Sequence, residues 1–384
     1  MSYQLIQSSA HQIPLSDETV QTCVTSPPYW GLREYAGEQE FVWGGDAEHG
    51  HEWEVETRWG KQGATNPTAT GTLTGGTAKY TPRAFEVTHG FCSCGAWRGA
   101  LGLEPTPELY VEHMVEVFRE VRRVLRPDGT LWLNLGDSYA GGASGSNPSP
   151  SSGLGSGPNG ASKHRDSVTF AVRPAVRGIK PKDLVGIPWR VAFALQADGW
   201  YLRSDIIWSK SNPMPESVTD RPTKAHEYIF LLSKSARYYF DADAVREEWQ
   251  QASIDRQRSP LRAQSPEDGF VASSALNREA PYEVKAGRNI RTVWDIATQP
   301  YAGAHFATFP EAIPERCIKA GSAPGDLVLD PFNGSGTTGR VAQRLGRDYV
   351  GLDTSSEYLE MALERVDPIA AVAKQTGGQQ AMPI

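Results

Sequence analysis

The spacing of apolar residues along the chain predicts strands and helices in alternation. Apolar runs of strand length occur at 19–25, 130–135, 202–208, 226–232, 327–330 and 348–352. Apolar residues at helical spacing or capping signals predict helices over 107–126, 188–196, 311–320, 337–345 and 356–366. Strands that alternate with helices are typical of a doubly wound, mostly parallel sheet, so the predicted fold class is α/β.

The predicted helix at 107–126 has clear signals at both ends. Thr106 is a suitable N-cap, Pro107 fits the first helical position, and Glu108 favours the positive end of the helix dipole. The Arg-Pro-Asp-Gly sequence at 126–129 ends the helix before the next strand.

The composition is that of a globular protein. Of 384 residues, 39 % are hydrophobic and 10 % aromatic, which excludes a wholly disordered chain. The chain has no run of about 18 apolar residues and no signal-peptide pattern, so we expect a cytoplasmic protein without a membrane partner. Four cysteines are too few for a disulfide framework.

The formal net charge of −7 is unevenly distributed. Residues 36–60 contain seven acids and one arginine, a local charge of −6, so the remaining chain carries −1. Residues 161–182 contain six bases and one acid, a local charge of +5. Because binding follows the local field, the acidic total does not exclude a nucleic-acid partner.

One candidate ligand site lies near the C-terminus. Residues 326–339 read DLVLDPFNGSGTTG, in which a strand ends at Asp330 and a turn with Gly334 and Gly336 leads into a helix. Glycines let the backbone approach a ligand, and N–H groups at the helix start attract its polar parts. A second strand ends at Asp353, whose carboxylate can accept hydrogen bonds from ribose hydroxyls. These features predict a nucleoside cofactor, and a simple tight turn is the alternative interpretation.

A second candidate site lies near the N-terminus, where residues 23–31 read CVTSPPYWG. Because proline has no backbone N–H, Pro27 and Pro28 end the strand at about Ser26. The Ser26 and Pro27 carbonyls and the Ser26 hydroxyl can then accept hydrogen bonds beside the flat apolar faces of Tyr29 and Trp30. Such acceptors suit a flipped-out base that bears an amino group, whose nitrogen lone pair then attacks a methyl electrophile. A Pro-Pro turn that only caps the strand is the alternative.

Together, these motifs resemble those of the amino-group DNA methyltransferases that use S-adenosylmethionine. TSPPYW resembles their catalytic motif, LDPFNGSGTTG their cofactor motif, and HFATFP at 305–310 a further cofactor element. The catalytic motif comes first, as in the β class. The resemblance covers 17–35, 105–140 and most of 184–366. It implies a Rossmann-like class I methyltransferase fold that is circularly permuted and carries loop insertions.

The resemblance also assigns roles to individual residues. It places the target base against Ser26, Pro27, Pro28 and Tyr29. It places S-adenosylmethionine against Asp330, Pro331, Phe332, Gly334, Ser335, Gly336 and Thr337, with its ribose on Asp353. It places the methionine part of this cofactor beside His305, Phe306, Phe309 and Pro310.

Serine at the first position of the catalytic motif is similar to the enzymes that methylate cytosine N4, whereas adenine N6 enzymes more often carry Asp or Asn there. We therefore expect site-specific methyl transfer to the N4 of a flipped-out cytosine, with adenine N6 as the alternative. An RNA or protein methyltransferase is disfavoured, because those families usually place the cofactor motif first. A non-catalytic DNA-binding relative is disfavoured by the intact motifs.

Two further polar positions follow predicted strands. Asp137, in NLGDSY, is a candidate to accept a hydrogen bond from the target amino group or to orient Ser26, and an acid that only starts a turn is the alternative. Lys210, in the Trp208–Pro213 segment, is at a strand end, where open α/β sheets place ligands, and is a candidate DNA contact.

The insertion at 36–104 contains residue types that bind metals. His49, His51, Cys92 and Cys94, with His89 nearby, lie on either side of a Thr- and Gly-rich stretch. A His-x-His and a Cys-x-Cys together suit a structural zinc site, although the common Cys-x₂-Cys spacing is missing. A set of unligated polar residues is the alternative interpretation.

DNA binding requires basic side chains near phosphates. The expected DNA partner is double-stranded, and two regions are candidates for contacting it: the basic stretch at 161–182 and the recognition region that the resemblance places at 241–300. The candidate residues are Lys163, Arg165, Arg173, Arg177, Lys180, Lys210, Arg288 and Arg291.

The expected organisation combines these regions. The catalytic half comprises 1–35, 105–140 and 184–240, and the cofactor half comprises 301–366. Between them lie the insertion 36–104, a Gly/Ser loop with the basic stretch at 141–183, the recognition region 241–300, and a disordered tail at 367–384. We expect a monomer or homodimer encoded by a bacterium or phage, acting alone or with a separate restriction endonuclease.

Overall fold

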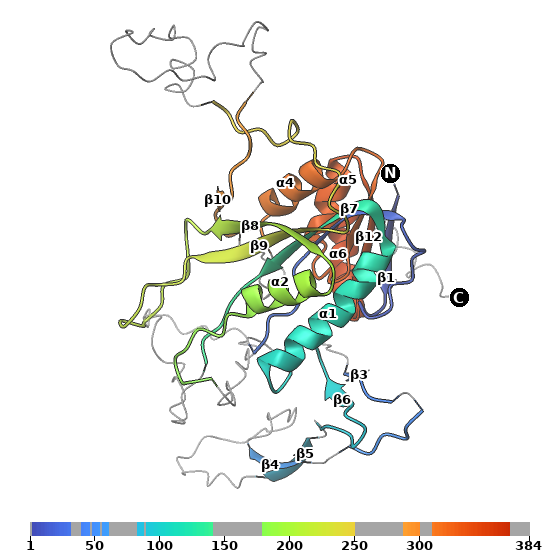
Figure 1. Cartoon of the computed structure of the whole chain (residues 1–384), viewed down its shortest axis with the longest axis vertical. Helices are drawn as coiled ribbons and strands as arrows, with labels where there is room; N and C mark the ends of the chain where they lie inside the picture. Colours follow the sequence, from blue (N-terminus) through green and yellow to red (C-terminus); the bar gives the residue numbers. More distant parts are fainter. Residues whose placement is uncertain are drawn as a thin grey trace, which may run out of the picture. The chain divides into compact units, whose positions relative to one another are not determined.

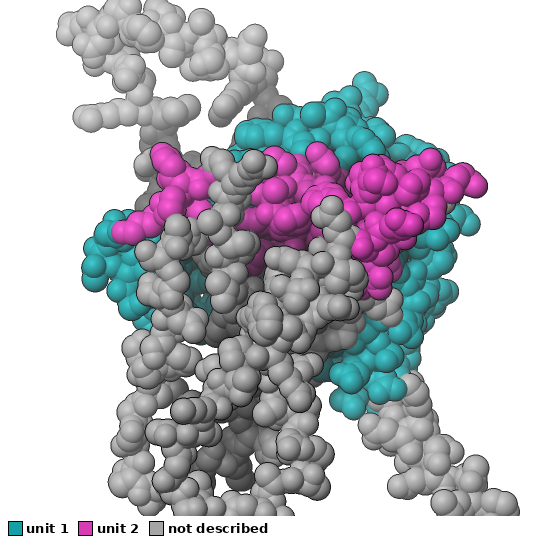
Figure 2. All heavy atoms as spheres, turned by 90° about the horizontal axis from the view of Figure 1, so that it is seen from below, with its two compact units in different colours: residues 1–29, 114–138, 184–384 teal, residues 30–113, 139–183 magenta. Residues whose placement is uncertain are grey.

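The computed structural model describes residues 2–31, 40–46, 48–53, 90–140, 179–249, 287–299 and 309–368, and the backbone of 56–60 and 83–87. The chain divides into two compact units, coloured in Figure 2. Unit 1 comprises residues 1–29, 114–138 and 184–384, and unit 2 comprises 30–113 and 139–183.

Unit 1 contains an eight-stranded sheet (Figure 1) with the order β1-β12-β11-β2-β7-β9-β8-β10. The strands are β1 (Tyr3–Gln7), β2 (Val20–Thr25), β7 (Leu125–Leu135), β8 (Tyr201–Ser209), β9 (His226–Ser233), β10 (Val293–Asp295), β11 (Leu327–Asp330) and β12 (Asp348–Asp353). Only β9 is antiparallel to its neighbours β7 and β8, and every other pair in this sheet is parallel. The predicted mostly parallel α/β fold is therefore confirmed.

The helices are α1 (Pro107–Val124), α2 (Ile187–Ala197), α4 (Ala312–Gly321), α5 (Thr337–Arg344) and α6 (Ser356–Val366). Their bounds agree with the predicted helices to within about two residues. Thr106 caps α1 as predicted, because its Oγ1 accepts a hydrogen bond from the Leu109 N–H at 3.2 Å. Strand β7 starts directly after α1, because Leu125 already pairs with Val20.

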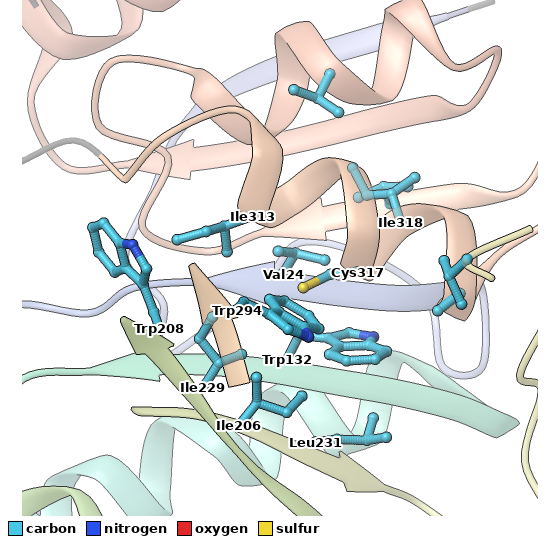
Figure 3. Packing of buried hydrophobic residues seen from close by; sticks show 14 of the residues in the cluster. Val24, Trp132, Ile206, Trp208, Ile229, Leu231, Trp294, Ile313, Cys317 and Ile318 are labelled. Carbon is cyan, nitrogen blue, oxygen red and sulfur yellow. The ribbon is translucent and has the colours of Figure 1, made fainter. Parts of the chain in front are cut away.

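Helices cover both faces of the sheet, with α4, α5 and α6 on one face and α1 and α2 on the other (Figure 1). Side chains alternate between the faces along each strand. On β7, Trp132 belongs to the buried cluster under α4, which Figure 3 shows with Trp294 and Cys317. Its neighbours Leu131 and Leu133 are fully buried outside that cluster. The central part of the sheet is therefore packed on both faces, and β2 is buried along its whole length.

Strands β1 and β10 were not predicted. Strand β1 lies at one edge of the sheet beside β12, and β10 has only three residues and lies at the other edge beside β8. Such short or half-exposed edge strands lack the continuous apolar run of a buried strand, so periodicity does not find them.

Unit 2 contains two antiparallel strand pairs. Strand β3 (Phe41–Trp43) pairs with β6 (Trp97–Gly99), and β4 (Glu56–Gly60) pairs with β5 (Arg83–Val87). The second pair lies between β3 and β6 in the sequence, so the two pairs are nested. None of the helices in the described ranges is long and apolar enough to span a membrane.

Candidate active site

The carboxyl ends of the parallel strands in unit 1 meet at one edge of the sheet. Both predicted motifs begin there, Ser26 directly after β2 and the glycine loop directly after β11. Strands β2 and β11 are neighbours, with Thr22 opposite Val328 and Cys23 opposite Leu329. Because β9 is antiparallel, its amino end, with His226 and Glu227, reaches the same edge.

The Ser26–Tyr29 turn is held by a chain of hydrogen bonds. The Ser26 hydroxyl donates to the Tyr29 hydroxyl at 3.2 Å, and the Tyr29 hydroxyl lies 2.8 Å from Glu227 Oε2 and 3.0 Å from Asn134 Oδ1. The Asn134 amide donates to the same Glu227 oxygen at 3.2 Å and to the Tyr228 carbonyl at 3.0 Å. The sequence analysis did not identify Asn134 or Glu227. The only signal for Glu227 was an acid within an otherwise apolar predicted strand.

The ring of Tyr29 requires a glycine at position 136. A Cβ added to Gly136 would lie 2.6 Å from Cε2 of Tyr29. This close approach fixes the ring against the end of β7. Trp30, the next aromatic residue, belongs to unit 2, where it is buried and its Nε1 donates to the Glu104 carbonyl at 2.9 Å.

Basic groups surround Glu227. Lys210 Nζ lies 2.5 Å from Glu227 Oε1 and 4.6 Å from the centre of the Trp208 ring. Lys210 is therefore engaged at the sheet edge rather than free for phosphate. Burial lowers the pKa of Lys224, whose ammonium donates to the Asp137 carbonyl at 2.8 Å. Burial also lowers the pKa of His226.

Asp137 supports the start of α2. Its Oδ1 accepts the backbone N–H groups of Ser138, Gly186 and Ile187 at 2.8, 3.0 and 3.1 Å. Such a cap satisfies N–H groups that have no partner within the helix. This geometry favours the alternative interpretation of Asp137 as a strand-end acid with a local structural role.

Asp330 joins the two motifs. Its side chain is buried, and its Oδ1 accepts the hydroxyl of Thr25 at 2.6 Å and the N–H of Phe332 at 3.1 Å. Burial raises the pKa of Asp330 to about 6, although these hydrogen bonds oppose the shift. Thr25 precedes Ser26, so Asp330 couples the glycine loop to the Ser26–Tyr29 turn.

The glycine loop is shaped by left-handed glycines and by side-chain hydrogen bonds. Gly334 and Gly336 have φ values of 47° and 75°, in the left-handed region that favours glycine. Asp353 Oδ2 accepts the Gly334 N–H at 2.8 Å, and Asn333 Oδ1 accepts the Tyr349 hydroxyl at 2.7 Å. Burial raises the pKa of Asp353. The structure thus brings Asp330, the glycine loop and Asp353 together, as expected.

Other residues predicted for the cofactor site have identified partners. Arg365 donates to the hydroxyls of Ser335 and Thr337 at 2.7 and 3.0 Å, so both hydroxyls face α6. Phe309 packs against the buried cluster of Figure 3, and the Pro310 carbonyl accepts the N–H of Ile313 in α4. Pro331 is buried and Phe332 is half-buried. His305 and Phe306 lie outside the described residues.

The candidate DNA-binding residues are only partly described. Lys163, Arg165, Arg173 and Arg177 lie outside the described residues, and Lys180 is exposed and lies 3.5 Å from Asp183. Arg288 and Arg291 both pair with Glu247 Oε2, at 2.9 and 2.8 Å. Their positive charge is therefore partly neutralised.

In unit 2, the four predicted metal-binding residues converge. One ligand atom from each of His49, His51, Cys92 and Cys94 lies within 4.8 Å of the others. The pKa of Cys92 is lowered to about 6, mainly by a backbone hydrogen bond from Cys94. His89 lies outside the described residues.

The fold defines the class of protein. PvuII DNA methyltransferase (cytosine-N4-specific) has a similar structure, with a TM-score of 0.52 and 16 % identity over 98 % of this chain and 91 % of its own. This likeness shows that the fold is that of the class I methyltransferases.

The sequence comparisons identify the family. A family model described as DNA methylase, for N6 and N4 methyltransferases, matches residues 20–364. Type II methyltransferase M.Cfr9I of Citrobacter freundii is 38 % identical over 92 % of this chain and 83 % of its own length. Type II methyltransferase M.SmaI of Serratia marcescens is 38 % identical over 92 % of this chain and 86 % of its own length. The chain belongs to the N6/N4 DNA methylase family and is a DNA methyltransferase, as the motif resemblance implies.

Proposed function

We propose that this enzyme transfers a methyl group from S-adenosylmethionine to the N4 of a cytosine flipped out of double-stranded DNA. The observation that carries the proposal is the adjacency of β2 and β11. Because these two strands are neighbours, the Ser26–Tyr29 turn and the Asp330–Gly336 loop begin side by side, and the Thr25 hydroxyl donates a hydrogen bond to Asp330. A methyl donor on one loop and an amino group on the other can therefore be held in line.

The glycine loop supports S-adenosylmethionine as the cofactor. An added Cβ at Gly334 would meet nothing closer than 3.9 Å, so the backbone there is open to a ligand, and Asp353 keeps lone pairs for ribose hydroxyls beside the bond to Gly334. Asp330 is buried and coupled to Thr25, so we assign it to shaping the loop. Phe332 lies in the same loop, is half-buried, and offers a flat aromatic face that suits the adenine ring. When bound, S-adenosylmethionine supplies the electrophilic methyl.

The hydrogen-bond chain supports a cytosine amino group as the acceptor of that methyl. A carboxylate only accepts hydrogen bonds, so the Tyr29 hydroxyl donates to Glu227, and the Tyr29 oxygen accepts the hydrogen bond from the Ser26 hydroxyl. The lone pairs of Ser26 Oγ are thereby left for the hydrogens of the target amino group. Glu227, whose other carboxylate oxygen pairs with Lys210, thus fixes the direction in which both hydroxyls donate, and we assign it as a positioning residue.

Replacing Glu227 tests this chain of bonds. In Glu227→Gln, we expect kcat to fall about tenfold to a hundredfold, as for the loss of a hydrogen bond to a charged group. DNA affinity and KM for S-adenosylmethionine should stay near those of the wild type. Glu216→Gln, which removes a comparable ion pair with Arg221, is the matched control and should leave kcat unchanged. An equal fall in both variants would contradict the assignment.

The identity of the methylated base is tested directly. The purified enzyme is incubated with DNA and S-adenosylmethionine that carries a deuterated methyl, and the digested nucleosides are analysed by mass spectrometry. The proposal expects labelled N4-methylcytidine nucleosides. Label found only in N6-methyladenine nucleosides would establish the alternative base, and no label in DNA would contradict the proposed activity itself.

The basic stretch at 161–182 is proposed as a DNA contact, together with Arg288 and Arg291 beside Glu247. Changing Arg173, Arg177 and Lys180 to Glu should weaken DNA binding and flatten its salt dependence, because phosphate contacts release counterions. S-adenosylmethionine binding should be unchanged. Unchanged DNA affinity at moderate salt would contradict this assignment.

A monomer or homodimer, with or without a separate restriction endonuclease, stays a prediction.

A further inference from the structure

Unit 2 contains a cluster of two histidines and two cysteines that methyl transfer does not use. Cys92 Sγ lies 3.5 Å from His49 Nδ1, and Cys94 Sγ lies 3.4 Å from His51 Nδ1. All four ligand atoms lie within 4.8 Å of one another. Each cysteine thus faces the histidine that is 43 residues before it in the chain.

We propose that His49, His51, Cys92 and Cys94 bind a structural zinc ion. Zinc binds sulfur at about 2.3 Å and imidazole nitrogen at about 2.0–2.1 Å, so a tetrahedral site separates these ligands by about 3.6 Å. The two sulfur–nitrogen distances of 3.5 and 3.4 Å match this edge. Four protein ligands complete the coordination of zinc, which is typical of a structural rather than a catalytic site.

The local backbone presents both thiols to the histidines. The Cys92 N–H donates to the Ala96 carbonyl at 2.7 Å, and the Gly95 N–H donates to the Cys92 carbonyl at 2.8 Å. Gly95, with φ 86°, allows this tight turn. The turn explains how a Cys-x-Cys sequence can serve in place of the more common Cys-x₂-Cys spacing.

The position of the cluster explains what the ion does. The histidines follow β3 and precede β4, and the cysteines follow β5 and precede β6. Because β3 pairs with β6 and β4 with β5, the cluster lies between two nested ladders in the sequence. The strands of these two pairs have only three or five residues each, and isolated two-stranded pairs are marginally stable. The ion would therefore tie the two arms of the insertion together.

The base of the insertion is held separately. The ring of His113 stacks between Trp43 and Trp97, with ring centroids 4.1 and 5.3 Å away, and its Nδ1 lies 2.9 Å from Glu104. His113 is thus held by two aromatic rings and a carboxylate. Its contacts with Trp43 and Trp97 anchor β3 and β6. The proposed zinc ion would therefore order the part of the insertion that lies between these two strands in the sequence.

Metal analysis of the full-length protein tests the proposal. Wild-type protein, purified without added metal and under reducing conditions, should contain about one equivalent of zinc per chain by inductively coupled plasma mass spectrometry. Cobalt(II) in place of zinc should give the strong charge-transfer absorption of thiolate ligands. Loss of outer-shell partners alone costs about 10- to 100-fold in metal affinity, so His51→Ala and Cys94→Ser should each lose at least that much.

Two controls make the result decisive. Cys317→Ala removes a cysteine buried in unit 1 and should keep the full zinc content. Retained S-adenosylmethionine binding, which uses unit 1, shows that a zinc-free variant is still folded. The proposal is overturned if reduced wild-type protein neither contains nor binds zinc, or if His51→Ala and Cys94→Ser keep the wild-type content. Its failure would leave the proposed methylation untouched.

Discussion

The catalytic edge of unit 1 and the His/Cys cluster of unit 2 are assembled in different ways. At the catalytic edge, neighbouring strands of a large sheet end together, and Ser26, Tyr29, Asn134 and Glu227 satisfy one another with hydrogen bonds. In unit 2, the cluster lies between two short antiparallel strand pairs in the sequence, its cysteine sulfurs lie 3.5 and 3.4 Å from histidine nitrogens, and its two histidine rings are 5.8 Å apart.

The comparison shows two routes to a preorganised site. The sheet of unit 1 is packed on both faces, so hydrophobic burial alone can hold its polar groups in place. The described residues of unit 2 pack around Trp43, Trp97 and His113, and the proposed zinc ion would add a second link beyond that core. We therefore expect changes at one site to leave the other unaffected.

The largest expected effect is the loss of both side chains of the catalytic turn. Ser26→Ala with Tyr29→Ala removes an acceptor and the stacking surface, and should lower the methylation rate by at least about 10²- to 10³-fold, the usual cost of one electrostatic contact at a reacting centre. Rates are measured by single-turnover methylation. Zinc content should be unchanged, which sharpens the comparison, whereas methylation at the wild-type rate would show that this turn is not catalytic.

A second prediction concerns the pH dependence of stability in unit 1. The pKa of Asp330 is raised from 3.8 to about 6, so between these values the folded protein keeps a proton that the unfolded chain has lost. The free energy of unfolding should therefore fall by up to about 3 kcal/mol as the pH rises through this window. Asp330→Asn keeps the hydrogen-bond acceptor without the charge and should lose this dependence. The free energies of unfolding of both proteins are measured in urea from pH 4 to 7. The same change with pH in both proteins would contradict the prediction.

A smaller effect is expected at the glycine loop. A Cβ at Gly336 would lie 2.9 Å from the Ala362 Cβ, whereas a Cβ at Gly325, whose φ is also positive, would meet nothing within 4 Å. Both Gly→Ala variants should be destabilised, because alanine is strained at a positive φ. Crowding should lower the free energy of unfolding of Gly336→Ala by about 1–3 kcal/mol more. Calorimetric titration should show weaker S-adenosylmethionine binding only in Gly336→Ala. Equal behaviour of the two variants would mean that crowding at α6 does not shape the loop.

The smallest expected effect crosses between the units. Removing zinc with a chelator should change the S-adenosylmethionine dissociation constant by less than about twofold, because the glycine loop is held within unit 1. The same treatment should increase proteolysis of the insertion. A large loss of cofactor affinity would break the comparison, since it would show that the insertion supports the catalytic unit.

Much of the fold was predictable because local signals and tertiary packing agree. The Pro-Pro step ends β2 at Thr25, the glycine loop separates β11 from α5, and Thr106 starts α1, each for a reason contained in a few residues. The same locality made the TSPPYW and LDPFNGSGTTG motifs recognisable. Edge strands such as β1 and β10 were missed because their formation depends on a neighbouring strand rather than on their own periodicity.

The sequence by itself determined the family, the order of the motifs and the types of side chain available for methyl transfer and metal binding. Only the tertiary structure decided which of them meet. The antiparallel direction of β9 brought Glu227 to Tyr29, α6 placed Arg365 on Ser335 and Thr337, and the start of α2 engaged Asp137. Such contacts join residues far apart in the chain, and their geometry follows from strand direction and packing, which no local pattern of residues encodes.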